Sequence, residues 1–202
     1  MNNHECKIIG IAGGSGVGKS TLAIGLVKKY PDQIALLHVD DYFKKSIDAP
    51  KIGDQVNWDH PDAVRFDDLY HDIVLLMHGK SVDIMTKSEL YNPDYKLELR
   101  NKIPYTVTSK PIILIEGYLA FHDVHIRDLM SLKVYLDMPI EETLKRRTKF
   151  TDEKYYQDIL IPMHEQFVNP TKAFADLVID VSKFGISEVR ELVEVRLKDW
   201  LK

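Results

Sequence analysis

The stretch "GIAGGSGVGKST" (Gly10–Thr21) separates an apolar run from a helix-like segment and fits the spacing G-x-x-x-x-G-K-[ST]. Glycines in such a loop let the backbone curl, so that successive N–H groups point at one phosphate. The helix that follows adds the positive end of its dipole. The stretch therefore predicts a phosphate-binding loop at a strand-to-helix turn.

The side chains that end this loop have chemical tasks of their own. Lys19 can reach the β- and γ-phosphates of a nucleoside triphosphate, and the Ser20 hydroxyl can be a ligand of Mg²⁺. We expect ATP and Mg²⁺ as the cofactors. The residues expected to bind the nucleotide are Gly13, Gly14, Ser15, Gly16, Val17, Gly18, Lys19, Ser20 and Thr21.

On either side of the loop, apolar runs alternate with helical patterns, which favours an α/β fold with a parallel sheet and crossover helices. The length of 202 residues suggests one domain over 1–202, with an insert at 81–110 that can hold short strands. The expected strands are Lys7–Ala12, Ile34–Val39, Pro111–Gly117, Leu132–Asp137 and Asp176–Asp180. The expected helices are Ser20–Tyr30, Pro61–Gly79, Ile140–Arg147, Glu153–Phe167 and Ser187–Leu201.

Composition excludes several classes of protein. The net charge of −4 argues against binding to nucleic acid or to an anionic membrane. Cys6 is the only cysteine, so the chain has no disulfide framework and no cysteine metal cluster. The polar start "MNNHECK" lacks the apolar core of a secretion signal, and no apolar run is long enough to span a bilayer. A cytoplasmic protein is expected.

A phosphate-binding loop is compatible with a small-molecule kinase, a GTPase switch or an ATPase motor. A switch needs the guanine-binding motif N-K-x-D, but Asn101 and Lys102 are followed by Ile103 and Pro104. A motor usually needs a longer chain. Phosphoryl transfer to an acceptor remains, and it requires a base, an acceptor pocket and cations for the moving charge.

Two polar stretches are candidates for the acceptor side. "HVDDYF" places Asp40 and Asp41 after a strand, where ligands bind in open α/β sheets. A carboxylate there can accept a proton or lie near Mg²⁺, but it can also serve as a turn or cap residue. "NWDHPDA" combines Trp58 and Asp59, which suits a base and a ribose, whereas Asp59 or His60 can equally cap the next helix. These alternatives stay open at this point.

Several motifs in order give a resemblance to a known family. "GGSGVGKST", "DHPDA", "ILIEGYLAFHDVHIRDLMSLKVYLD" and "VNPTKAFADLVID" resemble the uridine kinase family over nearly the whole chain. "HVDDYFK", the Trp58-Asp59 pair and "IPMHEQF" are also similar to nicotinamide riboside kinases.

The resemblance implies a P-loop kinase fold, with a parallel five-stranded core sheet flanked by helices, a small lid and an insert that covers the nucleoside. It implies ATP-dependent phosphorylation of the 5′-hydroxyl of a ribonucleoside, with uridine or cytidine as the leading acceptor. A nicotinamide riboside kinase, or another small-molecule kinase of the fold, is the alternative. A nucleotide-binding regulatory protein without transfer activity is the alternative of another class. The expected partners are the nucleoside and ATP, and a homo-oligomer is left open.

The resemblance also implies roles for single residues. Asp40 is the base and lies near Mg²⁺, Asp59 holds the ribose 2′- and 3′-hydroxyls, and Trp58 lies beside the base. Glu116, which ends "IILIEG", is expected near Mg²⁺ together with Ser20.

Arginines and an insert complete the implied site. Arg146 and Arg147 end a helix, and the resemblance places them at a lid, 147–155, that closes on the phosphates. The family reads the base with a Tyr-Asp pair, a histidine and an arginine. Here the segment is "MTKSELYNPDYKLELR", in which we expect Tyr91 or Tyr95, with Arg100, to take their place.

Replacing Lys19 tests the phosphate-loop assignment. Lys19→Ala should leave the fold intact and remove most activity, because the lysine lies on charge that shifts during phosphoryl transfer. Steady-state kinetics and thermal melting of the same preparation measure both effects. Near-normal turnover in a folded variant contradicts the assignment.

Overall fold

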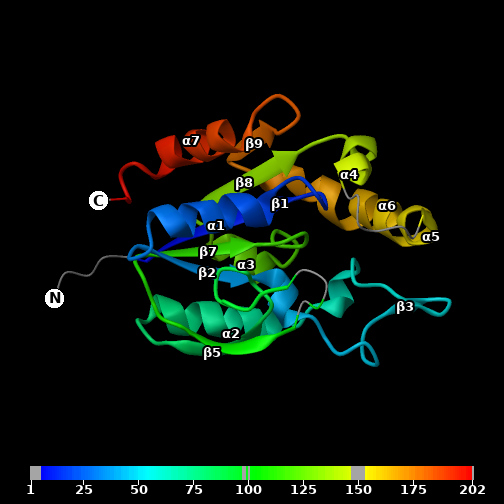
Figure 1. The fold of residues 1–202 in the computed structure, drawn as a ribbon, viewed down its shortest axis with the longest axis horizontal. Helices are drawn as coiled ribbons and strands as arrows, with labels where there is room; N and C mark the ends of the chain where they lie inside the picture. The colour runs from blue at the N-terminus through cyan, green and yellow to red at the C-terminus, as the bar shows by residue number, and fades with distance from the viewer. Residues whose placement is uncertain (1–5, 97–98, 100, 147–152, 202) are drawn as a thin grey trace.

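A five-stranded parallel sheet forms the centre of the computed structural model, which describes residues 6–96, 99, 101–146 and 153–201 (Figure 1). The strands lie in the order β2 (Ile34–His38), β7 (Ile112–Glu116), β1 (Lys7–Gly13), β8 (Leu132–Asp137) and β9 (Leu177–Asp180). Each adjacent pair is parallel. The predicted fold class, a parallel five-stranded core flanked by helices, is confirmed.

Helices cover both faces of the sheet. Side chains alternate along β1, so that Ile8 points to one face and Ile9 to the other. On the face of Ile9 lie α1 (Lys19–Lys29) and α7 (Ile186–Leu197). On the face of Ile8 lie α2 (Phe66–Met77) and α3 (Val124–Leu129).

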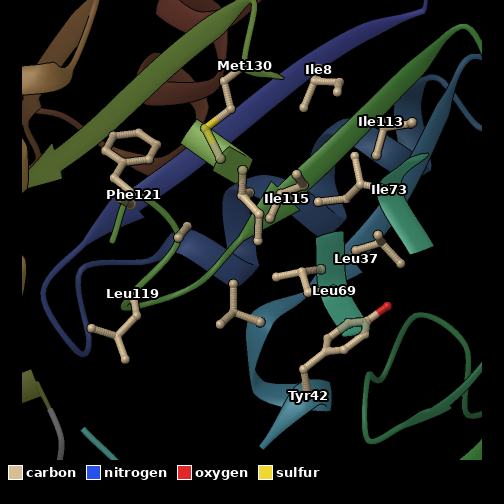
Figure 2. Close-up of a cluster of buried hydrophobic side chains, with 14 of the residues drawn as sticks. Ile8, Leu37, Tyr42, Leu69, Ile73, Ile113, Ile115, Leu119, Phe121 and Met130 are labelled. Carbon is tan, nitrogen blue, oxygen red and sulfur yellow. The ribbon is translucent and has the colours of Figure 1, made fainter. Parts of the chain in front are cut away.

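The core on the α2 face is continuous from helix to sheet. Figure 2 shows Leu69 and Ile73 of α2 beside Leu37, Ile113 and Ile115 of the sheet. These five side chains are at most 1% exposed. Burial of one such side chain stabilises a protein by about 1.5–3 kcal/mol, so this layer fixes the sheet under the site.

Shorter elements gather at the end of the molecule where the strands finish, around α4 to α6 and β3 (Figure 1). A hairpin of β5 (Val82–Thr86) and β6 (Ile103–Val107) packs against α2. The remaining elements are η1 (Val39–Tyr42), β3 (Lys51–Ile52), β4 (Gln55–Val56), η2 (Pro61–Ala63), α4 (Ile140–Arg146), α5 (Glu153–Tyr155), η3 (Tyr156–Leu160), α6 (Ile161–Met163), η4 (His164–Val168) and η5 (Asn169–Phe174). Among the described helices, none combines the length and the apolar character needed to cross a bilayer.

Three expected elements differ in detail. The helix expected over Pro61–Gly79 is divided into η2 and α2, because Val64 between them is extended and forms a β-bridge with Phe43. The run from Glu153 is helical but contains the two π-helical turns η3 and η4. The last helix ends at Leu197.

The α2 layer can be tested by a truncation in the core. Ile73 is 0% exposed, so Ile73→Ala should lower the free energy of unfolding by about 2–5 kcal/mol, through lost burial and a residual cavity. Val195→Ala on α7 is the control, because Val195 is 64% exposed and its truncation should change stability by at most about 0.5 kcal/mol. Urea titration measures both. Equal effects of the two variants contradict the described packing.

Candidate active site

The phosphate loop connects β1 to α1 and has the backbone that its glycines predict. Gly16 and Gly18 have φ angles of +85° and +97°, in the left-handed region that favours glycine. Lys19 is 9% exposed, and its Nζ donates to the Gly14 carbonyl oxygen across the loop at 2.7 Å. Helix α1 begins at Lys19, so the loop and the helix N-terminus point toward the same space, as anion binding requires.

Most of the loop residues line cavities, whereas Val17 packs into the core. Ser15, Gly16, Lys19 and Ser20 line the largest cavity, and Thr21 lines a neighbouring one. Val17 is 3% exposed and packs into the core on the α1 face, so it anchors the loop.

A buried carboxylate lies beside the loop. Glu116 is the last residue of β7 and is 4% exposed. Its Oε1 accepts a hydrogen bond from Ser20 Oγ at 3.0 Å and lies 2.6 Å from His38 Nδ1. Burial lowers the pKa of His38, but the hydrogen bond and charge of Glu116, with the charges of Asp41 and Asp40, outweigh burial and raise it.

These oxygens suit a magnesium ion held with a nucleotide. Magnesium typically binds one or two protein oxygens together with phosphate oxygens and water, rather than a full cage of side chains. Ser20 and Glu116 supply such oxygens at the helix N-terminus. Among the described residues, no group of three or more His, Cys, Asp or Glu side chains could hold a metal by itself. The arrangement fits a nucleotide-bound magnesium.

Asp40 and Asp41 have different environments. They lie in the 3₁₀ turn η1, not at the end of a straight strand as expected. The Asp40 side chain is 48% exposed, lines the largest cavity and pairs with Lys87 Nζ at 3.6 Å. Asp41 is 4% exposed, and its Oδ1 accepts from the Lys87 backbone N–H at 3.2 Å. Burial raises the pKa of the Asp41 carboxyl.

Gly117 fixes how η1 sits against the sheet. A Cβ at Gly117 would lie 2.5 Å from Cβ of Val39, which is closer than such atoms approach in proteins. The glycine after Glu116 therefore lets the turn that carries Asp40 pack directly on the end of β7.

The largest cavity has a volume of about 800 Å³ and contacts both the phosphate loop and η1. Its wall carries lysines, carboxylates and aromatic rings. The lining residues are Ser15, Gly16, Lys19, Ser20, Asp40, Phe43, Lys44, Gln55, Val56, Trp58, Asp59, Lys87, Lys102, Glu116, Gly117, Tyr118, Tyr155 and Tyr156.

Trp58 and Asp59 lie on the wall of this cavity. The Trp58 ring packs against Phe43 with centroids 5.5 Å apart. Asp59 Oδ2 accepts a hydrogen bond from the Tyr155 hydroxyl at 2.7 Å. The side chain that caps η2 is His60, whose Nδ1 accepts from the Asp62 backbone N–H at 3.1 Å. The geometry thus leaves the Asp59 carboxylate on the cavity, with the cap supplied by its neighbour.

The hairpin does not place its aromatic residue where we expected. The Tyr91 hydroxyl donates to the Leu36 carbonyl oxygen at 3.0 Å, on the edge strand β2, and its ring stacks on Tyr105 at 4.0 Å. Tyr91 is not among the described residues that line the largest cavity. Lys87 and Lys102 line it instead, and the Lys102 Nζ donates to the Asp41 carbonyl oxygen at 2.9 Å. Burial lowers the pKa of Lys102.

Several expected residues lie outside what the structure describes. Arg100 and Arg147 are outside the described residues, as is most of the expected lid. Arg146 is the last residue of α4, and its side chain is not described. Tyr95 lines a second cavity of about 290 Å³, which also contacts Thr21 and Asp41.

His164 was not singled out by the sequence. It is 6% exposed, and a Cβ at Gly14 of the phosphate loop would lie 3.4 Å from its Cε1. Burial lowers the pKa of His164. It also lines a third cavity, of about 310 Å³, together with Asp137 at the end of β8 and Asp180 at the end of β9. The His164 imidazole therefore packs beside Gly14 of the phosphate loop.

Comparison with known proteins places the chain in a family. A model described as "Phosphoribulokinase / Uridine kinase family" matches residues 8–184. A uridine kinase of Staphylococcus epidermidis (strain RP62A) is 34% identical over 188 residues, which cover 87% of this chain and 88% of that protein.

Solved structures share the fold. A possible uridine kinase from Bacillus stearothermophilus aligns with a TM-score of 0.53 and 22% identity, over 89% of this chain and 91% of that one. Phosphoribulokinase from Rhodobacter spheroides aligns with a TM-score of 0.61 and 11% identity, over 90% and 74%. The family model and the relative both match most of the chain, and the phosphate loop and the buried Glu116 agree with that match. The chain therefore belongs to the phosphoribulokinase/uridine kinase family.

Proposed function

We propose that the protein transfers the γ-phosphoryl group of ATP to the 5′-hydroxyl of a ribonucleoside, with uridine or cytidine as the leading acceptor. The observation that carries the proposal is the shared cavity. Lys19 and Ser20 of the phosphate loop lie on one part of its wall, and Asp40 and Asp59 lie on another. A triphosphate and a hydroxyl acceptor that both enter this cavity would meet. The relatives named uridine kinase support this reading.

Asp40 is the base in this proposal. Its carboxylate takes the proton of the 5′-hydroxyl while the 5′-oxygen bonds to the γ-phosphorus. The bond from that phosphorus to the oxygen bridging to the β-phosphate breaks, and ADP leaves. Lys87, 3.6 Å from Asp40, holds the carboxylate on the cavity wall.

Lys19 and the loop N–H groups hold the phosphates and stabilise their charge. Ser20 and Glu116, with Asp40 nearby, would hold magnesium. When it is bound, the magnesium ion neutralises negative charge on the phosphate oxygens.

The acceptor wall supports a nucleoside but not one particular base. Trp58 offers an aromatic face, and Asp59 offers carboxylate oxygens to a ribose diol. Lys87 and Lys102 are donors only, so they suit carbonyl oxygens on the base. Uracil, cytosine and nicotinamide all carry one. A nicotinamide riboside kinase remains the second candidate, supported by the Trp58-Asp59 pair that lines the cavity.

A panel of acceptors tests the proposed function. Uridine, cytidine, nicotinamide riboside and adenosine are each incubated with MgATP, and ADP release and product mass are measured. Uridine or cytidine should give a product one phosphate heavier, and Lys19→Ala should not form it. Acceptor-dependent turnover with nicotinamide riboside alone favours the second candidate. ATP binding with no acceptor-dependent turnover overturns the kinase proposal in favour of a regulatory role.

The assignment of the base predicts unequal effects at two adjacent residues. Asp40→Asn should lower kcat by about 10²–10⁴, the usual effect of losing a positioned base. Asp41→Asn should lower kcat far less, because Asp41 is 4% exposed and is not among the described residues that line the largest cavity. The kcat values and melting temperatures of both variants are compared. The reverse ranking of kcat shows that Asp41, not Asp40, faces the acceptor.

The role of Asp59 predicts the preference for ribose. A site built to bond a hydroxyl rejects the analogue that lacks it, by about 10⁴ at the extreme. Asp59→Ala should raise KM for the ribonucleoside and reduce the ratio of ribonucleoside to 2′-deoxynucleoside kcat/KM. His60→Ala is the matched control, since it removes the cap of η2 and should lower the melting temperature while the ratio stays unchanged. An unchanged ratio in Asp59→Ala excludes Asp59 from the ribose site.

A further inference from the structure

A chain of polar side chains runs from the exposed Ser20 of the phosphate loop, through three buried residues, to the β5–β6 hairpin. Ser20 Oγ donates to Glu116 Oε1 at 3.0 Å, and the same oxygen lies 2.6 Å from His38 Nδ1. On the other side of the imidazole, His38 Nε2 lies 2.8 Å from Ser88 Oγ. We call these four residues the polar chain. It connects the magnesium side of the site to the hairpin that lines the acceptor cavity.

The donors and acceptors in the polar chain can be assigned. A carboxylate only accepts, so His38 Nδ1 carries the hydrogen that faces Glu116. The Leu90 backbone N–H donates to Ser88 Oγ at 3.3 Å, which leaves the Ser88 hydroxyl hydrogen available for His38 Nε2. His38 thus has a hydrogen-bonding partner at each ring nitrogen. It acts as a rigid spacer between Glu116 and Ser88, which are each at most 7% exposed.

His38 restrains the orientation of Glu116. Hydrogen bonds to a charged group are short and about twice as strong as neutral ones, and the 2.6 Å contact is of this kind. Partners behind a metal-binding side chain commonly fix its orientation and affect metal affinity. His38 is the last residue of β2, directly opposite Glu116 in the parallel register, so the sheet itself sets this contact.

The other nitrogen of His38 ties down the hairpin. Ser88 follows Lys87, whose ammonium pairs with Asp40 and whose backbone N–H donates to Asp41. The Ser88 backbone N–H also donates to Thr86 Oγ1 at 3.0 Å, so the backbone N–H groups of Lys87 and Ser88 are both hydrogen-bonded. Loss of the His38–Ser88 bond should loosen the position of Lys87 relative to Asp40.

We propose that His38 is a positioning residue with two separable tasks. Through Nδ1 it holds Glu116 for the magnesium nucleotide, and through Nε2 and Ser88 it holds the hairpin against the acceptor site. The first task rests on the proposed binding of MgATP, and the second on the proposed acceptor cavity.

Two substitutions at His38 separate these tasks. An asparagine places its amide nitrogen where His38 Nδ1 lies, so His38→Asn keeps the donor to Glu116 and loses the bond to Ser88. A glutamine reaches the position of Nε2, so His38→Gln keeps the contact with Ser88 and loses the donor to Glu116. Ser88→Ala removes the second bond from its other end.

Calorimetry with MgADP, and with ADP in EDTA, measures the first task without any acceptor. His38→Gln should weaken MgADP binding about tenfold and change ADP binding in EDTA less than twofold, because the lost bond acts through Glu116. His38→Asn should bind MgADP within about threefold of the unmodified protein. His38→Gln binding MgADP normally, or losing affinity for both forms equally, overturns this part of the proposal.

Hydrogen exchange measures the second task, also without acceptor. His38→Asn and Ser88→Ala should speed exchange over 86–92 about tenfold, His38→Gln should not, and the double variant His38→Asn/Ser88→Ala should exchange no faster than the single ones. Where a nucleoside is phosphorylated, the same two single variants should raise its KM severalfold. Unchanged exchange in both single variants overturns the link to the hairpin. A protein that shows these effects but phosphorylates no nucleoside would refute the proposed acceptor and leave the role of His38 standing.

Discussion

The site depends on the position of β7 between β1 and β2. In the parallel register, Glu116 at the end of β7 lies opposite His38 on one side and Ile11 on the other. The phosphate loop begins two residues after Ile11, and the turn with Asp40 begins directly after His38. The phosphate loop, the buried Glu116 and the exposed Asp40 lie close together because the carboxyl ends of β1, β2 and β7 are at the same end of the sheet. Ligands bind at this end in other open α/β sheets.

Features encoded by neighbouring residues could be predicted from the sequence. The strand Leu132–Asp137 has the expected bounds, and the phosphate loop has the strand before it and the helix after it that its spacing requires. Asp40 lies on the cavity and Asp41 does not face it, although the local backbone is a 3₁₀ turn rather than an extended strand end. In these cases, apolar runs and glycine spacing carry enough information because the contacts that matter are local.

Features that depend on the order of the strands could not be predicted in this way. His38 and Glu116 are 78 residues apart, and their contact exists only because β2 pairs with β7. Tyr91 resembles a base-binding tyrosine in sequence, yet its hydroxyl bonds the backbone of β2, which has an open edge there. The sequence could not show whether Asp59 or His60 caps the next element; the structure shows His60 as the cap of η2, and the role of Asp59 as a ligand stays a prediction. Arg100 and Arg147 lie outside the described residues and stay predictions.

The bond between Tyr155 and Asp59 affects the energetics of binding. It joins residues 96 positions apart, from the segment before η2 and from α5. The phenol holds the carboxylate in one rotamer, so the entropy of fixing that side chain is lost when the protein folds and not when a ligand arrives. A ligand that bonds Asp59 thus meets a preorganised acceptor. Its binding free energy is more favourable because the cost of ordering this side chain has already lowered the stability of the folded protein.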